Sequence, residues 1–228
     1  MFLGYGTEKV TRMKITIFGA GYVGLVTGAS LANLGHDVLC IDIDERKIVA
    51  LGRGEIPFFE PGLSDLVKTN VEKGRLRFSA QGQDGVEFGD VIFNCVGTPA
   101  TSNGSANLEY VYSVAKTVAR YATSYKVLIN KSTVPPGTAR QCQELIARVG
   151  KEDLVEVISN PEFLKQGNAV YDFNHPDKVV VGGKSPGDFW KEQGAIRSAL
   201  QSEVVRGPPG GDSGGPGRRN RRSRARAL

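Results

Sequence analysis

The sequence predicts an α/β fold in which helices cover both faces of a doubly wound parallel sheet. From Lys14 onward, short apolar and β-branched runs alternate with amphipathic stretches, which is the pattern of parallel strands joined by crossover helices. A glycine-rich turn, Gly19–Gly24, lies between the first such run and the first helical stretch. The chain has 228 residues, of which 40% are hydrophobic, so it can bury one sizeable core and not two large ones.

The expected elements follow one another closely along the chain. Strands are expected at Ile15–Phe18, Asp37–Asp42, Leu76–Ser79, Val91–Val96, Lys126–Asn130 and Val155–Ser159. Helices are expected at Tyr22–Leu34, Glu45–Leu51, Gly62–Glu72, Leu108–Tyr121 and Thr138–Val149. The run Lys178–Gly182 is a candidate edge strand, and Pro186–Ser202 is a candidate further helix.

The two ends of the chain differ from the body between them. Met13 directly precedes the first expected strand, so we expect residues 1–12 to be an N-terminal extension, with either Met1 or Met13 as the true start. Residues 13–205 are expected to form the folded domain. After Val205 the sequence is rich in Gly, Pro and Arg and almost free of apolar residues. Such a segment cannot bury a core, so we expect residues 206–228 to be a disordered tail.

The formal charge of +5 is distributed very unevenly. Residues 206–228 hold seven arginines and one aspartate, a net charge of +6, which leaves −1 for the first 205 residues. The body is therefore not a basic protein that seeks polyanions. The arginine run could contact phosphates in a salt-sensitive way, but no aromatic residue is interleaved to stack on bases, and nucleic acid is not an expected partner.

The cysteines and the apolar runs exclude several classes of protein. Cys40, Cys95 and Cys142 are widely spaced, with no Cys-x-x-Cys pair and no adjacent histidine, so we expect buried reduced thiols and no metal site. No apolar run approaches the roughly 20 residues that cross a bilayer, and Met1–Thr11 lacks the apolar core of a signal peptide. A cytoplasmic protein without a membrane partner is therefore expected.

The glycine turn is the first functional candidate. In a nucleotide-binding turn of this kind, Gly19 permits the bend, Gly21 lets the backbone approach a pyrophosphate, and Gly24 lets the helix pack closely on the strand. Asp42, at the end of the second strand, can accept the ribose hydroxyls of an adenosine. It would also repel a 2′-phosphate and favour NAD over NADP, although Lys47 opposes this.

The alternative is a glycine turn without a ligand, followed by an aspartate that caps the next helix. Asp44 is the better cap, because it directly precedes the helical run that begins at Glu45. Asp42 is then left without that role. The strand, turn, helix and acid together predict a Rossmann-like dinucleotide site that binds NAD.

Three later segments follow strands at the same edge of the expected sheet. They are Val96-Gly97-Thr98-Pro99, the run from Lys131 to Thr138, and Ser159-Asn160-Pro161-Glu162-Phe163-Leu164. Ordinary turn chemistry accounts for each of them taken singly. Because ligands of open parallel sheets lie beyond the carboxyl ends of the strands, their shared position favours one crevice to which all three contribute.

In combination, these motifs resemble the UDP-glucose 6-dehydrogenases, within the wider nucleotide-sugar dehydrogenases. The matching motifs are Gly19–Leu25, Pro57-Phe58-Phe59-Glu60-Pro61-Gly62-Leu63, Lys131-Ser132-Thr133-Val134-Pro135, Ser159–Leu164 and Pro176-Asp177-Lys178-Val179-Val180-Val181-Gly182-Gly183. The resemblance runs from about Met13 to Gly183. Its last motif is closer to the UDP-glucose branch than to the GDP-mannose branch.

The resemblance implies NAD-dependent oxidation of UDP-glucose to UDP-glucuronate, through two hydride transfers and a cysteine thioester, in polysaccharide biosynthesis. It also implies that full-length members oligomerise. The implied cofactor-binding residues are Gly19, Ala20, Gly21, Tyr22, Val23, Gly24, Asp42, Lys47, Val96, Gly97, Thr98, Pro99, Ser132, Thr133, Val134 and Gln166. Thr133 and Glu162 would handle the water and protons of acyl hydrolysis, Glu162 as general acid or base. The implied substrate-binding residues are Glu162, Phe163, Leu164 and Lys165.

The sequence also departs from the family pattern. Most relatives have a glutamate where this chain has Gln166, which puts the orientation of the nicotinamide in doubt. The family's nucleophilic cysteine and catalytic lysine lie beyond the matched segment, and Cys40, Cys95 and Cys142, expected in two strands and a helix, do not replace that nucleophile. We therefore expect the isolated chain to be inactive.

The tail is typical of a shifted reading frame in GC-rich DNA, and we interpret the chain as the N-terminal part of a dehydrogenase. The alternatives are an NAD-binding module without catalysis, and a dehydrogenase of GDP-mannose or another nucleotide sugar. Translation of the coding DNA past codon 200 in the other two frames would separate the first two readings.

Overall fold

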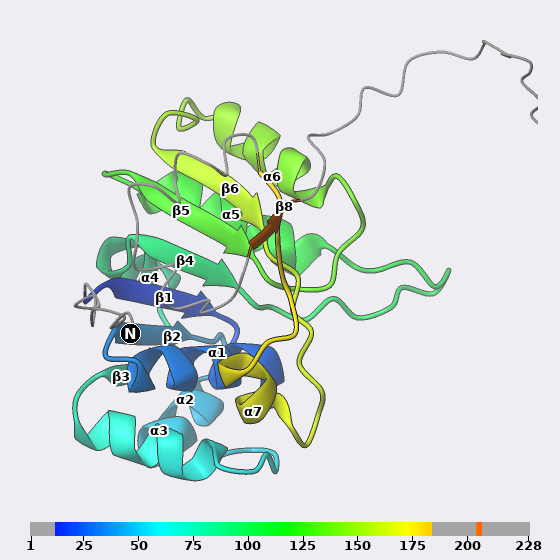
Figure 1. Ribbon diagram of the computed structural model, residues 1–228. Coiled ribbons are helices and arrows are strands. Elements are labelled where there is room, and N and C mark those ends of the chain that lie inside the picture. The colour runs from blue at the N-terminus through cyan, green and yellow to red at the C-terminus, as the bar shows by residue number, and fades with distance from the viewer. Residues whose placement is uncertain (1–11, 184–203, 207–228) are drawn as a thin grey trace, which may run out of the picture.

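Six short parallel strands form the central sheet of the structure, a computed structural model that describes residues 12–183 and 204–206 (Figure 1). They are β1 (Lys14–Phe18), β2 (Asp37–Ile41), β3 (Leu76–Ser79), β4 (Val91–Asn94), β5 (Lys126–Asn130) and β6 (Val155–Ser159). Every residue of β4 and β5 is buried. Helices cover both faces of the sheet, which explains why these strands are nearly continuous apolar runs rather than alternating ones.

The strand order is β3-β2-β1-β4-β5-β6, and every neighbouring pair is parallel. The chain fills one half of the sheet outward from β1 to β3 and then returns to place β4 on the other side of β1. This order confirms the predicted Rossmann-like, doubly wound α/β fold. The direction of winding reverses between β1 and β4, and ligands of such sheets bind at the carboxyl ends of the strands next to that reversal.

Seven helices are described, and they divide between the two faces. They are α1 (Tyr22–Asn33), α2 (Glu45–Gly52), α3 (Leu63–Glu72), α4 (Gly82–Phe88), α5 (Glu109–Tyr121), α6 (Thr138–Ala147) and α7 (Ala169–Asn174). Side chains of α1, α2, α3 and α7 contribute to one buried cluster, and those of α4, α5 and α6 to the other. In Figure 1, α7 lies beside α1 although the two are far apart in the sequence.

Helix α1 is buried on most of its circumference, from Gly24 through Ala32. A Cβ atom on Gly28 would lie 2.8 Å from the Cys40 sulfur, so the helix approaches β2 as closely as its backbone allows. A helix enclosed by a sheet and two other helices needs no polar face. This explains why its sequence is apolar and small throughout rather than amphipathic.

The expected elements and the structure differ mainly at element ends and in two short helices. Strands expected to reach Asp42 and Val96 end at Ile41 and Asn94, so Cys95 follows β4 instead of lying within it. The sequence did not predict α4 or α7. Their few residues carry little helical periodicity, and α4 depends on tertiary packing: a Cβ on Gly85 would lie 2.7 Å from Ile41.

The candidate edge strand at Lys178–Gly182 forms, but it does not join the central sheet. Strand β7 (Val179–Val181) pairs in parallel with β8 (Val204–Arg206) and not with the central sheet. An antiparallel bridge between Ser159 and Gly182 and a hydrogen bond from the Asn160 side chain to the Val180 carbonyl connect it to the end of β6. Strand β8 includes Arg206, the first residue of the expected tail. The candidate helix Pro186–Ser202 and residues 207–228 lie outside the described residues.

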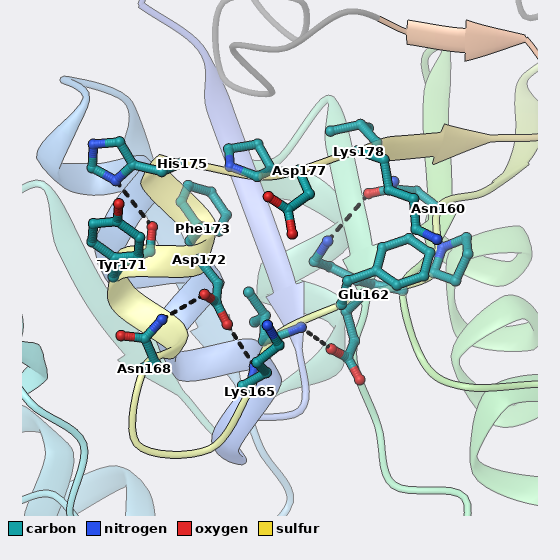
Figure 2. Close-up of a pocket in the computed structure, with 16 residues that line it drawn as sticks. Asn160, Glu162, Lys165, Asn168, Tyr171, Asp172, Phe173, His175, Asp177 and Lys178 are labelled. Atoms are coloured by element: carbon teal, nitrogen blue, oxygen red, sulfur yellow. Dashed lines mark hydrogen bonds between the residues drawn. The ribbon is translucent and has the colours of Figure 1, made fainter.

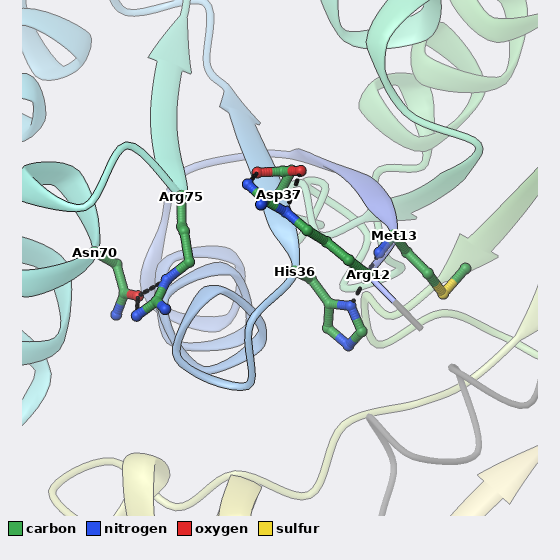
Figure 3. A network of polar contacts seen from close by, with 6 residues as sticks. All are labelled: Arg12, Met13, His36, Asp37, Asn70 and Arg75. Carbon is green, nitrogen blue, oxygen red and sulfur yellow. Dashed lines mark hydrogen bonds and ion pairs between the residues drawn. The ribbon is translucent and has the colours of Figure 1, made fainter. Parts of the chain in front are cut away.

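The folded domain contacts Arg12, the last residue of the expected N-terminal extension. The Arg12 guanidinium donates Nε–H to Asp37 Oδ2 at 2.7 Å and pairs with Oδ1 through Nη2, which ties this residue to the start of β2 (Figure 3). Met13 N–H donates to Nδ1 of the fully buried His36 at 3.3 Å. Arg12 therefore belongs to the folded domain, and residues 1–11 lie outside the described residues.

All three cysteines are buried and free, as predicted. Burial raises the pKa of Cys40 and of Cys142, and it raises the pKa of Cys95 to about 12. Within residues 12–183 and 204–206, no group of cysteine, histidine and carboxylate side chains is arranged to hold a metal ion. In the same part of the chain, no helix has both the length and the apolar character to cross a membrane.

Candidate functional site

The turn between β1 and α1 has three glycines in three different environments. Gly19 has a φ of 93°, and a Cβ there would lie 2.8 Å from the Cys95 carbonyl oxygen. A Cβ on Gly24 would lie 1.8 Å from the Gly19 carbonyl oxygen, so packing requires glycine at both positions. A Cβ on Gly21 would meet nothing within 4 Å. The backbone of Gly21 is thus open to a ligand, which fits a pyrophosphate approaching this turn.

The N-terminus of α1 faces the same open space. Gly21 is the N-cap and makes no side-chain capping hydrogen bond, and the first turn contains no acidic residue. The N-terminal amides of a helix and the positive end of its dipole attract anions when no side chain satisfies them. The turn and the helix start therefore form a seat suited to a phosphate group.

Asp42 ties the end of β2 to this turn. Its Oδ2 accepts hydrogen bonds from Ala20 N–H and from the Lys47 ammonium, both at 2.9 Å, and its Oδ1 accepts from Asp44 N–H at 3.1 Å. Asp44 caps α2 by accepting from the amides of Arg46 and Lys47, as predicted. Asp42 is thus left to the glycine turn, with a side chain that is 11% exposed and faces a cation.

The loops after β4 and β5 are bonded to one another. Ser132 Oγ–H donates to the Val96 carbonyl oxygen at 2.7 Å, and Thr98 Oγ1–H donates to the Thr133 carbonyl oxygen at 3.0 Å. The expected cofactor residues after β4 and β5 therefore lie in two loops joined at the carboxyl edge of the sheet, beside the glycine turn. The Ser132 side chain is almost fully buried, so its hydroxyl supports the loops.

A cavity of about 430 Å³ opens between the loop after β6 and the segment from α7 to β7 (Figure 2). The residues around it are Lys131, Asn160, Pro161, Glu162, Phe163, Leu164, Lys165, Asn168, Tyr171, Asp172, Phe173, His175, Pro176, Asp177, Lys178 and Val179. All four expected substrate-binding residues, Glu162 to Lys165, are among them. Thr133 and Gln166 are not, so the structure does not bring Thr133 into one cavity with Glu162.

The walls of the cavity combine aromatic rings with charges. The Lys178 ammonium lies 4.6 Å from the centre of the Phe163 ring, and the Tyr171 ring stacks on His175 at 4.4 Å. Asp172 accepts from Lys165 N–H at 2.9 Å and so fixes the loop against α7. Rings and cations side by side suit a ligand that carries both flat and anionic groups.

Glu162 and Lys131 are the ionisable groups at the β6 side of the cavity. Glu162 is half-buried, and its Oε2 accepts from Leu164 N–H at 2.6 Å. Lys131 is 6% exposed, and its ammonium donates to Asn160 Oδ1 at 3.3 Å. Burial lowers the pKa of Lys131, although Cys95 and Glu162 oppose that shift. The sequence placed Lys131 and Asn160 in motifs but gave them no role; a lysine directly after an apolar strand was the available signal.

Glu60 is a third residue to which the sequence gave no role. It is 4% exposed and accepts from Tyr22 O–H and Gly167 N–H, both at 2.8 Å, and from Ala169 N–H at 2.7 Å. It thereby connects the glycine turn with the loop that carries Gln166. The only signal was its position in the motif Pro57–Leu63, where a glutamate lies among apolar and turn residues.

Comparisons with known proteins identify relatives by sequence and by structure. Residues 13–196 match the UDP-glucose/GDP-mannose dehydrogenase family, NAD binding domain. UDP-glucose 6-dehydrogenase from Rhizobium meliloti is 48% identical over 171 residues, and UDP-glucose 6-dehydrogenase YwqF from Bacillus subtilis is 47% identical over 171 residues. Each match covers 75% of this chain and 39% of the relative, so the chain spans about two fifths of the length of these proteins.

Two solved structures share the fold. A ternary complex of GDP-mannose dehydrogenase from Pseudomonas aeruginosa is 34% identical with a TM-score of 0.78, and the match covers 85% of this chain and 46% of that one. UDP-glucose dehydrogenase from Pyrobaculum islandicum is 30% identical with a TM-score of 0.77, and that match covers 90% of this chain and 47% of the other.

Proposed function

Because the chain belongs to the UDP-glucose/GDP-mannose dehydrogenase family and matches its NAD-binding domain, we propose that it supplies the cofactor-binding part of an enzyme that oxidises UDP-glucose to UDP-glucuronate. The observation that carries the cofactor part is the glycine turn. Its first and third glycines are closed by packing, whereas the backbone of Gly21 is open beside the start of α1. NAD, when bound there, supplies the hydride acceptor.

The residues that would hold NAD follow the carboxyl ends of five strands, β1, β2, β4, β5 and β6. Gly19–Gly24 would bind the pyrophosphate, with Asp42 accepting the ribose hydroxyls and Lys47 beside it. The loops Val96–Pro99 and Ser132–Val134 would line the cofactor further along the edge of the sheet. Gln166 would reach the nicotinamide end as a neutral residue. These roles are supported by the shared edge and by the hydrogen bonds between the loops.

The cavity beyond β6 would hold part of the sugar nucleotide. Phe163, Leu164 and Lys165 would border it, and Glu162 would accept or deliver a proton during hydrolysis of the acyl intermediate. Thr133 would support the water from the neighbouring loop, outside the cavity. The second half of the site and the cysteine nucleophile would come from the parts of the relatives that this chain does not span.

The experiment is a chimera in which residues 13–183 of this chain replace the matching segment of the Rhizobium meliloti enzyme. We expect NADH formation from UDP-glucose, reduced about 10²–10⁴-fold by Glu162→Gln, which removes a general acid or base. Glu156→Gln, on β6 but outside the cavity, is the matched control and should leave the rate unchanged. A chimera that binds NAD but forms no NADH, or a Glu162→Gln variant with full activity, would contradict the proposal.

GDP-mannose is the second candidate substrate, because the GDP-mannose dehydrogenase of Pseudomonas aeruginosa matches 85% of this chain. Titration of the chain with UDP-glucose and GDP-mannose in the presence of NAD separates the two. Tighter binding of GDP-mannose would favour this alternative.

A further inference from the structure

A buried carboxylate joins the glycine turn to the loop at the entrance of the cavity. Glu60 lies before α3, whereas its partners Gly167 and Ala169 lie more than a hundred residues later in the sequence. Its Oε2 accepts from Tyr22 and Gly167, and its Oε1 accepts from Ala169. Burial raises the pKa of Glu60, but the hydrogen bonds from these three groups and from the Val170 backbone outweigh it and the net shift is downward. The group is therefore ionised at neutral pH, which makes it a fixed anchor.

Tyr22 extends this anchor into the cofactor site. It is the first residue of α1 and directly follows Gly21, so its backbone belongs to the turn proposed to hold the pyrophosphate. Its ring contacts Phe58 at 5.4 Å, and its hydroxyl lies 2.8 Å from Glu60 and 3.0 Å from the Lys165 carbonyl oxygen. Burial and the nearby carboxylate raise the pKa of Tyr22, so the phenol keeps its proton. The ionised carboxylate is the stronger of the two acceptors.

The loop that these residues hold has no regular secondary structure of its own. Residues 160–168 contain no helix or strand, and Gly167 has a φ of 87°, which glycine adopts readily. Phe163, Lys165 and Gln166 are exposed. Asp172 also holds the loop, because it accepts from Lys165 N–H and from the Asn168 side-chain amide. Glu60 is the group that ties the loop to Tyr22 at the glycine turn.

We propose that Tyr22 and Glu60 are positioning residues that couple the NAD turn to the loop bordering the sugar nucleotide, so that NAD bound at the turn steadies Phe163–Gln166. This proposal rests on the proposed function. Hydride transfer requires the nicotinamide and the sugar to be aligned closely. The turn proposed to hold the NAD pyrophosphate and the loop proposed to border the sugar come from opposite halves of the sheet. A hydrogen-bonded buried carboxylate between the two loops fixes that alignment. A ligand that restrains one end of such a link lowers the entropy cost of ordering the other.

Hydrogen exchange of the Gly167 and Ala169 amides tests the coupling in the 228-residue chain. In the unaltered protein, saturating NAD should slow exchange of these amides about fivefold or more, the range of ordinary coupling between sites. Tyr22→Phe keeps the ring but removes the hydroxyl, and Glu60→Gln removes the charge; both should abolish the NAD-dependent slowing. Without NAD, Glu60→Gln should speed exchange roughly tenfold to a hundredfold. Each variant is measured at an NAD concentration that a separate titration shows to be saturating.

Tyr125→Phe is the matched control, because Tyr125 also donates to a glutamate, Glu156 at 2.6 Å, at the amino end of β5. It should leave the NAD-dependent slowing intact. Variants that speed exchange equally with and without NAD would overturn the coupling and leave Glu60 with a structural role alone. A chain that binds NAD without slowing these amides would overturn it as well. A flat NAD titration would instead overturn the proposed function and the coupling with it.

Discussion

Replacing Asp42 with alanine removes one carboxylate that serves both the turn and the proposed ribose site. The side chain is 11% exposed and accepts from Ala20 N–H and Lys47 at 2.9 Å and from Asp44 N–H at 3.1 Å. A hydrogen bond to a charged group contributes about 1.5–3 kcal/mol. We therefore expect Asp42→Ala to weaken NAD binding by about 1–3 kcal/mol, or roughly fivefold to 150-fold.

Two further variants separate the roles of charge and of shape. Asp42→Asn keeps an oxygen that can accept from Ala20 but loses the charge, so it should bind NADP better relative to NAD, because the carboxylate no longer repels the 2′-phosphate. Lys47→Met removes the cation beside Asp42 and should sharpen the preference for NAD. Opposite shifts in cofactor preference from these two changes would identify the Asp42–Lys47 pair as the determinant.

The assay is isothermal calorimetry with NAD and NADP at about 0.15 M ionic strength, where the Debye length is about 8 Å and only nearby charges contribute strongly. Denaturant unfolding of each variant checks that the turn is altered and not the whole fold. Equal affinity of the unaltered protein for NAD and NADP would refute the reasoning, as would an Asp42→Ala variant that binds NAD normally.

Three other expectations follow from particular atoms. Gly24→Ala places a Cβ 1.8 Å from the Gly19 oxygen, so it should lower the free energy of unfolding by about 1–3 kcal/mol. Gly21→Ala places a Cβ that meets no neighbour, so it should reduce NAD affinity alone. Equal unfolding midpoints for the two variants would contradict this expectation. Burial lowers the pKa of His36, so the neutral ring stabilises the folded state above about pH 6.5, and this contribution is lost as the pH falls below that value. Denaturant midpoints should therefore fall further with acid in the unaltered protein than in His36→Gln. The isolated chain should form no NADH from UDP-glucose, because burial holds the pKa of Cys95 at about 12 and raises that of the other two thiols; turnover abolished by replacing a cysteine would overturn this.

Local sequence patterns predicted most of the fold. Apolar runs marked all six strands of the central sheet, and the glycine turn marked the start of α1 correctly at Tyr22. Such patterns failed where an element depends on distant partners. The short helix α4 contains Gly85 because β1 and β2 leave no room for a side chain there. Strand β7 pairs with a strand more than twenty residues later instead of joining the sheet, which periodicity alone does not determine.

The sequence likewise predicted one part of the candidate site and missed another. Asp42 and the glycine turn lie within thirty residues of one another, and their spacing predicted one site. The motif Ser159–Leu164 identified one wall of the cavity, but the opposite wall, with Tyr171 and Lys178, became visible only when α7 was placed beside α1. The family resemblance implied a shared role for Thr133 and Glu162, and of these two residues Glu162 lines the cavity and Thr133 does not.

The sequence by itself determined the fold class and the family resemblance, and it named candidate residues for NAD, because those features are encoded in short segments with a fixed spacing. Only the tertiary structure decided which polar groups are buried together. Glu60 was one carboxylate among 24 acidic residues until the fold brought Tyr22, Gly167 and Ala169 around it. Burial makes those contacts strong and specific, since an unsatisfied charge in the interior costs several kcal/mol, and burial is a property of the folded chain that no local pattern contains.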